Sequence, residues 1–322
     1  MIRRAVPALA LLALWTAPLA VRAEDAATDG QVDPPLVDIS SLPDVSGQLI
    51  MRKSFESEHV EDRPLLIWLP PSYNAGDERY PVVYLLDAEH MFVSEWAKPS
   101  RTEWRVDETM TELIAEGAIR EAIIVGVPSN GAKRDREYLP KSAYKRPSLR
   151  STQKTRTLGP VSRSLNDAHK AFLTEELKPY IDALARTRPG RDDTYVMGAS
   201  FSGLAVIDLM ISHPDTFGAA AALSPSLSIA DEAVAKQFAR TLPDPATHRL
   251  YIDRGTRGLD ARYGRGFSIV SRAARETGYT DGDGFRADTV RGAYHTARDF
   301  RDRIDRPLRF LLAVPDEEGT DR

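Results

Sequence analysis

Short apolar segments alternate with amphipathic ones between residues 81 and 312, and this alternation constrains the fold more than any other feature. Apolar runs bounded by Gly, Pro, Asp or Ser predict buried strands at 81–87, 122–127, 193–197, 219–223, 249–253 and 285–290. Helical periodicity predicts helices between them, at 106–116, 165–186, 202–212, 231–241, 266–277 and 296–312. The sequence therefore predicts a mostly parallel, twisted α/β sheet with helices on both faces.

The regions around this alternation set the expected domain limits. Two apolar runs, 49–58 and 64–69, predict an opening antiparallel strand pair. Residues 24–45 are rich in Asp, Ala, Gly and Pro without periodicity, so we interpret them as a linker. A single domain over 46–314, followed by a polar tail at 315–322, is the simplest organisation.

The first 23 residues resemble an export signal. Two arginines precede an apolar stretch at 8–15, and Val-Arg-Ala at 21–23 is typical of a cleavage site. That stretch is too short to span a bilayer, although a retained anchor helix is the alternative. We expect a periplasmic or secreted bacterial protein whose mature chain has no integral membrane span.

The absence of cysteine narrows the chemistry. It excludes a disulfide scaffold, thiolate zinc and iron–sulfur sites and a cysteine nucleophile, so covalent catalysis would use Ser, Thr, Lys or a carboxylate. The 43 basic and 47 acidic residues nearly balance, which argues against a dedicated nucleic-acid binder. The six histidines show no metal-binding spacing, and we expect neither a metal nor an organic cofactor.

Gly198-Ala-Ser200-Phe-Ser202 lies between a predicted strand and a predicted helix. This context is typical of a nucleophile elbow, in which crowding requires small residues two positions before and after the serine. Ser202 stands where glycine is usual. The amides at the helix N-terminus, that of Phe201 first, would face an oxyanion beside Ser200. A tight turn with a serine N-cap is the alternative.

The order serine, acid, histidine along the chain then points to the partners of Ser200. Asp253 and Asp260 follow the predicted strand at 249–253, and we favour Asp260 because it lies farther into the loop, while Asp253 is the alternative. His295 is the only histidine after them and follows the last strand. The motif Ser151-Thr-Gln-Lys154 matches S-x-x-K, but the companion motifs are absent, so we give it little weight.

Several segments together resemble the esterase D-type branch of the α/β-hydrolases, from about residue 64 to residue 312. They include Tyr80-Pro-Val-Val-Tyr-Leu-Leu-Asp87, Ile123-Ile-Val-Gly-Val127, Glu175-Glu-Leu-Lys-Pro-Tyr-Ile-Asp182, the elbow and Leu223-Ser-Pro-Ser226. That branch contains S-formylglutathione hydrolases, feruloyl and acetylxylan esterases, siderophore-lactone esterases and mycolyltransferases.

The resemblance implies an α/β-hydrolase fold and serine ester hydrolysis through Ser200, His295 and Asp260. In relatives the strand that matches residues 81–87 ends in Leu-Asp-Gly and an amide just beyond it completes the oxyanion hole, so the match assigns the second donor to the Glu89 amide, with Ala88 as the alternative. Ala88 itself stands where relatives have glycine. Candidate substrate contacts are Asp87, His90 and Tyr138. Ser202 has a parallel in the mycolyltransferases, so an acyltransferase remains an alternative, as does a binding protein without turnover.

The expected substrate is a small-molecule or carbohydrate-linked ester. Residues 133–156 carry nine Lys/Arg and two acids, with Tyr138 and Tyr144 among them. A basic, tyrosine-bearing segment beside the site would attract an anionic aromatic ester, such as a catecholate siderophore or a hydroxycinnamoyl sugar. The alternative is a solvated loop without a role in binding.

Overall fold

The computed structural model describes residues 35–144 and 160–314. The predicted export signal, the first half of the predicted linker (24–34), the Ser151-Thr-Gln-Lys154 motif and the polar tail lie outside the described residues.

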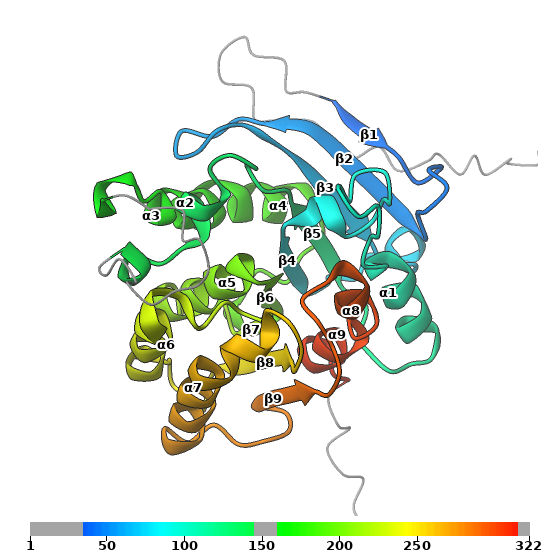
Figure 1. Cartoon of the computed structure of the whole chain (residues 1–322). Coiled ribbons are helices and arrows are strands. Elements are labelled where there is room, and N and C mark those ends of the chain that lie inside the picture. The colour runs from blue at the N-terminus through cyan, green and yellow to red at the C-terminus, as the bar shows by residue number, and fades with distance from the viewer. Residues whose placement is uncertain (1–34, 145–159, 315–322) are drawn as a thin grey trace, which may run out of the picture. The chain divides into compact units, whose positions relative to one another are not determined.

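A nine-stranded sheet runs through the described part of the chain, in the order β1-β2-β3-β5-β4-β6-β7-β8-β9 (Figure 1). From β5 to β9 every neighbouring pair is parallel, whereas β1, β2, β3 and β5 pair antiparallel. The strands are β1 (Leu36–Asp38), β2 (Gln48–Phe55), β3 (Arg63–Leu69), β4 (Val82–Leu86), β5 (Ile123–Val127), β6 (Thr194–Ala199), β7 (Ala219–Leu223), β8 (Arg249–Gly255) and β9 (Phe285–Val290). The predicted mostly parallel sheet is confirmed.

Helices cover both faces of this sheet. The α-helices are α1 (Val106–Ala115), α2 (Arg134–Tyr138), α3 (Asn166–Ala171), α4 (Lys178–Leu184), α5 (Phe201–Ser212), α6 (Ile229–Thr241), α7 (Gly264–Glu276), α8 (Ala297–Arg301) and α9 (Asp305–Leu311). Figure 1 shows α1, α8 and α9 on one side and α2 to α7 on the other. Each side has its own apolar core cluster, because strand side chains alternate between the two faces.

Shorter helical turns complete the described chain. The 3₁₀ turns are η1 (Tyr73–Ala75), η2 (Ala88–His90), η3 (Lys141–Tyr144), η4 (Val161–Arg163), η6 (Arg191–Asp193) and η7 (Asp260–Tyr263), and η5 (Phe172–Leu177) is a π-helical turn. Two of these turns, η2 and η7, follow strands and carry residues of the predicted site.

The structure differs from the sequence expectations in three places. The sheet begins at β1, inside the range 24–45 that we interpreted as a linker, because this short strand owes its conformation to pairing with β2. The helix expected at 165–186 is α3, η5 and α4 in succession. The helix expected at 296–312 is divided into α8 and α9, and Pro307 lies in the first turn of α9, where proline needs no hydrogen-bond partner.

The parallel part of the sheet gathers the predicted site residues at one edge. Asp87 and Glu89 follow β4, Ser200 follows β6, Asp260 follows β8 and His295 follows β9. Parallel strands all end at the same edge, which is where ligands bind in open α/β sheets.

Candidate active site

Ser200 occupies a strained turn between β6 and α5. Its backbone has φ 60° and ψ −116°, a region that residues other than glycine rarely adopt. The turn is crowded, since a Cβ atom on Gly198 would lie 2.9 Å from atoms of Ser202. The Ser200 amide donates to the Leu223 carbonyl over 3.0 Å, while the Phe201 amide is the first of α5 and has no acceptor within the helix.

His295 is hydrogen-bonded to Asp260. The His295 Nδ1 atom lies 2.6 Å from Asp260 Oδ1, and the Asp260 side chain is completely buried. Asp260 Oδ2 accepts hydrogen bonds from Ser224 Oγ at 2.5 Å and from the Gly255 amide at 2.7 Å. Burial by itself would raise the pKa of Asp260, but the hydrogen bonds from His295 and Ser224 outweigh it and hold the pKa below its ordinary value. Asp260 therefore faces His295 as a carboxylate.

Asp253, the alternative acid, has other partners. Arg303 Nε donates to its Oδ2 at 2.8 Å, and the Ser224 amide donates to its Oδ1 at 2.9 Å. Both side chains of the Asp253–Arg303 ion pair are almost completely buried. Burial raises the pKa of Asp253 in spite of the opposing charge of Arg303. Asp253 thus lies behind Ser224, while Asp260 contacts the imidazole.

Ser200 and His295 are connected through neighbouring side chains. Ser200 Oγ lies 3.2 Å from Ser226 Oγ, which lies 3.1 Å from the Tyr263 hydroxyl. The Tyr263 ring meets the His295 ring edge to face at 5.7 Å, and Phe300 contacts the same imidazole at 5.1 Å. The hydrogen bonds between described residues include none that joins Ser200 directly to His295.

Sequence reasoning had no role for Ser226 or Tyr263. Ser226 belongs to the segment Leu223-Ser-Pro-Ser226 that carries the family resemblance, and no sequence pattern marks a tyrosine three residues after Asp260. Burial raises the pKa of Tyr263 to about 12, against the effect of its hydrogen bonds with Ser226 and Ser200. Its hydroxyl therefore stays protonated around neutral pH and is available as a donor beside Ser200.

The loop after β4 forms the other side of the site. Asp87 has a left-handed backbone, with φ 62° and ψ 38°, and leads into η2. The Glu89 side chain accepts hydrogen bonds from the Ser129 amide at 2.9 Å and from the Ser129 hydroxyl. The Glu89 amide itself has no acceptor among the hydrogen bonds of the described residues. The Ala88 amide has none there either, so both candidate donors of this loop are unused, while the Glu89 side chain is fixed to the loop that follows β5.

Ala88, which stands where relatives have glycine, fits because β5 has a glycine beside it. A Cβ atom on Gly126 would lie 2.9 Å from the Ala88 Cβ, 3.1 Å from the Leu66 Cβ and 3.1 Å from a ring carbon of Phe92. The space left by Gly126 is therefore the space that the Ala88 methyl group uses.

Gly126→Ala is accordingly expected to destabilise the protein by about 1–3 kcal/mol, the usual range for an overpacked core. It should also lower ester hydrolysis, because relief of the contact moves the loop that carries Ala88 and Glu89. Urea unfolding and steady-state kinetics measure the two effects. Ala88→Gly in the same chain should recover part of the lost stability and part of the lost activity. If neither is recovered, the contact with the Ala88 methyl group is not the cause of the losses.

Two of the three candidate substrate contacts need reassignment. Asp87 is buried and bonded to Arg134 and Ser202, with distances of 2.6–2.7 Å. Tyr138 is completely buried. Among the described residues, both side chains are therefore closed off from solvent. His90 is partly exposed at the end of η2 and keeps its candidacy.

The described part of the basic segment is largely neutralised. Lys133 pairs with Glu61, Arg134 with Asp87 and Lys141 with Asp167. Arg136 donates from Nε to a backbone carbonyl. Carboxylates therefore offset the charges of Lys133, Arg134 and Lys141, whereas Arg136 keeps its charge. The other five Lys/Arg of residues 133–156 lie outside the described residues.

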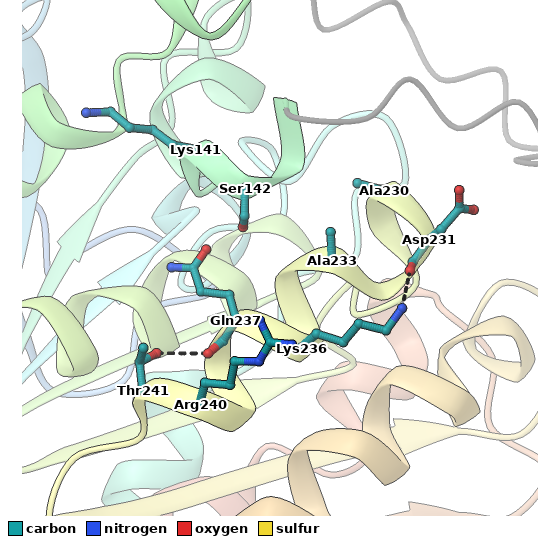
Figure 2. Close-up of a pocket in the computed structure, with 9 residues that line it drawn as sticks. All are labelled: Lys141, Ser142, Ala230, Asp231, Ala233, Lys236, Gln237, Arg240 and Thr241. Carbon is teal, nitrogen blue, oxygen red and sulfur yellow. Dashed lines mark hydrogen bonds between the residues drawn. The ribbon is translucent and has the colours of Figure 1, made fainter.

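A pocket of about 620 Å³ lies between η3 and α6 (Figure 2). Figure 2 shows Ser142 and Gln237 facing each other across it, whereas Lys141 and Asp231 point away. Ser200, Asp260 and His295 are not among its lining residues, so it is separate from the candidate active site. Within the described ranges, no cluster of three or more potential metal ligands occurs. In the same ranges, no helix is long and apolar enough to cross a membrane.

Comparison with known proteins identifies the family. The family model described as "Putative esterase" matches residues 57–304. The chain belongs to this family. It is therefore a carboxylic ester hydrolase with an α/β-hydrolase fold, and the resemblance inferred from the sequence is confirmed. No curated protein matches this esterase.

Solved structures share the fold of the esterase at low sequence identity. The ferulic acid esterase of the anaerobic fungus Anaeromyces mucronatus has a TM-score of 0.56 and 18% identity, with 88% of this chain and 92% of that chain covered. An IroE-like serine hydrolase from Shewanella oneidensis has a TM-score of 0.57 and 20% identity, with 81% of this chain and 79% of that chain covered. The enterochelin esterase from Shigella flexneri has a TM-score of 0.60 and 18% identity, with 86% of this chain and 58% of that chain covered.

Proposed function

We propose that this esterase is an exported serine hydrolase in which Ser200, His295 and Asp260 act as a catalytic triad. The observation that carries the proposal is the 2.6 Å contact between His295 Nδ1 and buried Asp260, at the sheet edge where the strained elbow presents Ser200. An acid bonded to Nδ1 orients the imidazole, leaving Nε2 as the base for a serine nucleophile.

The reaction follows from these positions in two steps. Ser200 Oγ attacks the ester carbonyl while His295 Nε2 takes its proton, and the amides of Phe201 and Glu89 donate to the developing oxyanion. His295 then passes the proton to the leaving alcohol. Water, deprotonated by the same imidazole, attacks the acyl-enzyme and releases the acid and free Ser200.

Before the first step, the Ser200 hydroxyl must turn from Ser226 to the imidazole. Hydrogen bonds between catalytic groups are often long or absent in ligand-free enzymes and form in the substrate complex. The Ser226 and Tyr263 hydroxyls hold Ser200 in the resting site, and Tyr263 and Phe300 keep the imidazole in place. We propose Ser226 and Tyr263 as positioning residues of the nucleophile.

For the substrate we propose aryl, acyl-sugar or siderophore esters, with His90 as a contact. The support is the similarity of the fold to a ferulic acid esterase and an enterochelin esterase. Export to the periplasm or the medium rests on residues 1–23, whose two arginines, apolar stretch and Val-Arg-Ala sequence are typical of a signal peptide.

A panel of esters, run beside Ser200→Ala, tests the proposal. It comprises short aryl esters, feruloyl sugars and a catecholate siderophore lactone, with a fluorophosphonate probe for the nucleophile. We expect turnover of at least one ester class and labelling at Ser200, both lost in Ser200→Ala. Labelling that persists in Ser200→Ala would contradict the assignment. Acyl transfer to a sugar alcohol that outpaces hydrolysis would instead support the acyltransferase alternative.

A further inference from the structure

The two backbone donors of the proposed oxyanion hole follow strained residues on different strands. Ser200, with φ 60°, precedes the Phe201 amide at the end of β6. Asp87, with φ 62°, precedes η2 and the Glu89 amide at the end of β4. The ψ angle of Ser200 sets the direction of the Phe201 amide, whereas the backbone of Asp87 sets the direction in which η2, and with it the Glu89 amide, leaves β4. Such conformations cost about 1–3 kcal/mol each and persist only where the surroundings hold them.

A single buried hydroxyl links these two turns. Ser202 Oγ lies 2.6 Å from Asp87 Oδ2, and it accepts the Ala199 amide at 2.9 Å. Its other neighbour is the Ala199 carbonyl, at 2.7 Å. The hydroxyl has one proton, and the carboxylate is the stronger acceptor, so the proton goes to Asp87. Ser202 is completely buried, which makes this bond inaccessible to competing water.

Arg134 also binds the carboxylate of Asp87. Its Nε and Nη2 atoms donate to the two carboxylate oxygens of Asp87, at 2.7 and 2.6 Å. The guanidinium carbon also lies 5.6 Å from the centre of the Phe201 ring and 5.3 Å from that of Tyr138. Arg134 thus contacts a side chain from each of the two turns. A bidentate pair of this kind fixes orientation as well as distance.

We propose that Ser202, Asp87 and Arg134 form an oxyanion clamp, a set of positioning residues that fixes the spacing of the Phe201 and Glu89 amides. The inference rests on the proposed function, since it assigns a purpose to residues around the same site. Glycine at position 202 would leave the turn geometry possible but would provide no hydroxyl for Asp87. In this chain the serine therefore has a role in catalysis rather than being only a tolerated replacement.

Ser202→Ala is the principal test, because it removes the hydroxyl without adding volume to the crowded elbow. Oxyanion donors act mainly in the transition state, so a misplaced donor lowers kcat more than it raises KM. We expect kcat per titrated Ser200 to fall about 10-fold, less than the 100-fold or greater loss that follows removal of a whole donor. KM should change less than about 2-fold. An aryl boronic acid, as a transition-state analogue, should bind about 10-fold more weakly.

Active-site titration separates this effect from a loss of folded protein. A purely structural role would lower the titratable fraction and leave kcat per titrated site unchanged. Ser271→Ala is the matched control, because Ser271 is a buried helical serine on α7 whose hydroxyl donates to the Phe267 carbonyl at 2.8 Å. It should leave both kcat and boronate affinity unchanged.

A double-mutant cycle tests whether the parts act as one unit. Asp87→Ala removes the acceptor and Ser202→Ala removes the donor of the same link, so the double variant should lose little more activity than the more impaired single variant. Ser202→Gly should behave as Ser202→Ala does. If the two single losses of activity multiplied in the double variant, the clamp would be overturned and the proposed function would stand. Normal kcat and boronate binding in Ser202→Ala would have the same meaning. A wild-type protein with neither ester turnover nor labelling of Ser200 would overturn both.

Discussion

Asp260→Asn is expected to lower kcat by about 10⁴-fold, the effect of the corresponding change in other serine hydrolases with such a triad. Asparagine can present an amide N–H to His295 Nδ1, and the imidazole then carries its proton on Nε2, where the base is needed. The loss of the negative charge also removes the stabilisation of the imidazolium that forms during attack. KM should change little, because Asp260 is completely buried and contacts the imidazole through its Nδ1 side.

Steady-state kinetics on the best ester of the panel measure the effect, and Asp253→Asn provides the comparison. Asp253 contacts Arg303 and Ser224 rather than the imidazole. Assayed well below its melting temperature, Asp253→Asn should keep kcat within about 10-fold of wild type, since it changes only the residues behind the triad. Equal losses in the two variants would mean that Asp260 has no special relation to His295.

The fold and the order of the site residues were predictable because both depend on patterns within single segments. Buried parallel strands are short apolar runs, and a glycine before a serine at a strand end is recognisable from the chain alone. The positions of Ser200, Asp260 and His295 at one sheet edge then follow from topology. The choice between Asp253 and Asp260 rested on loop length, which does not show which carboxylate turns towards the imidazole.

The remaining features depend on contacts between segments distant in sequence. Tyr138 occurs in a basic stretch that indicates a solvated loop, yet it is completely buried and lies against Arg134. The fit of Ala88 depends on Gly126, and the role of Ser202 depends on Asp87, which is 115 positions away. Hydrophobic periodicity carries no information on contacts between such distant residues. The sequence therefore indicates the reacting residues better than the residues that position them.

Arg303→Met is expected to reduce the free energy of unfolding by about 3–5 kcal/mol, the usual cost of leaving a buried charge without its partner. Arg303 is almost completely buried and bonds Asp253 through Nε and Nη2. Its Nη2 also donates to Ser224 Oγ at 2.8 Å, and Ser224 in turn donates to Asp260. Methionine has a similar length but leaves Asp253 buried without its counter-ion, with only the Ser224 amide and the Tyr251 hydroxyl as donors. The melting temperature should fall by roughly 10 °C for a domain of this size.

Thermal unfolding at several pH values distinguishes loss of the ion pair from loss of packing. Without Arg303, burial raises the pKa of Asp253 further above that of the unfolded chain. A raised carboxyl pKa gives stability at low pH that is lost as the pH rises through the folded-state pKa. The deficit against wild type should therefore be smallest near pH 4 and increase towards neutrality, and Asp253→Asn in the same chain should recover part of it. Arg298→Met, an exposed change on α8, should shift stability by less than about 0.5 kcal/mol. A deficit that does not vary with pH would mean that Arg303 contributes volume to the core rather than charge to Asp253.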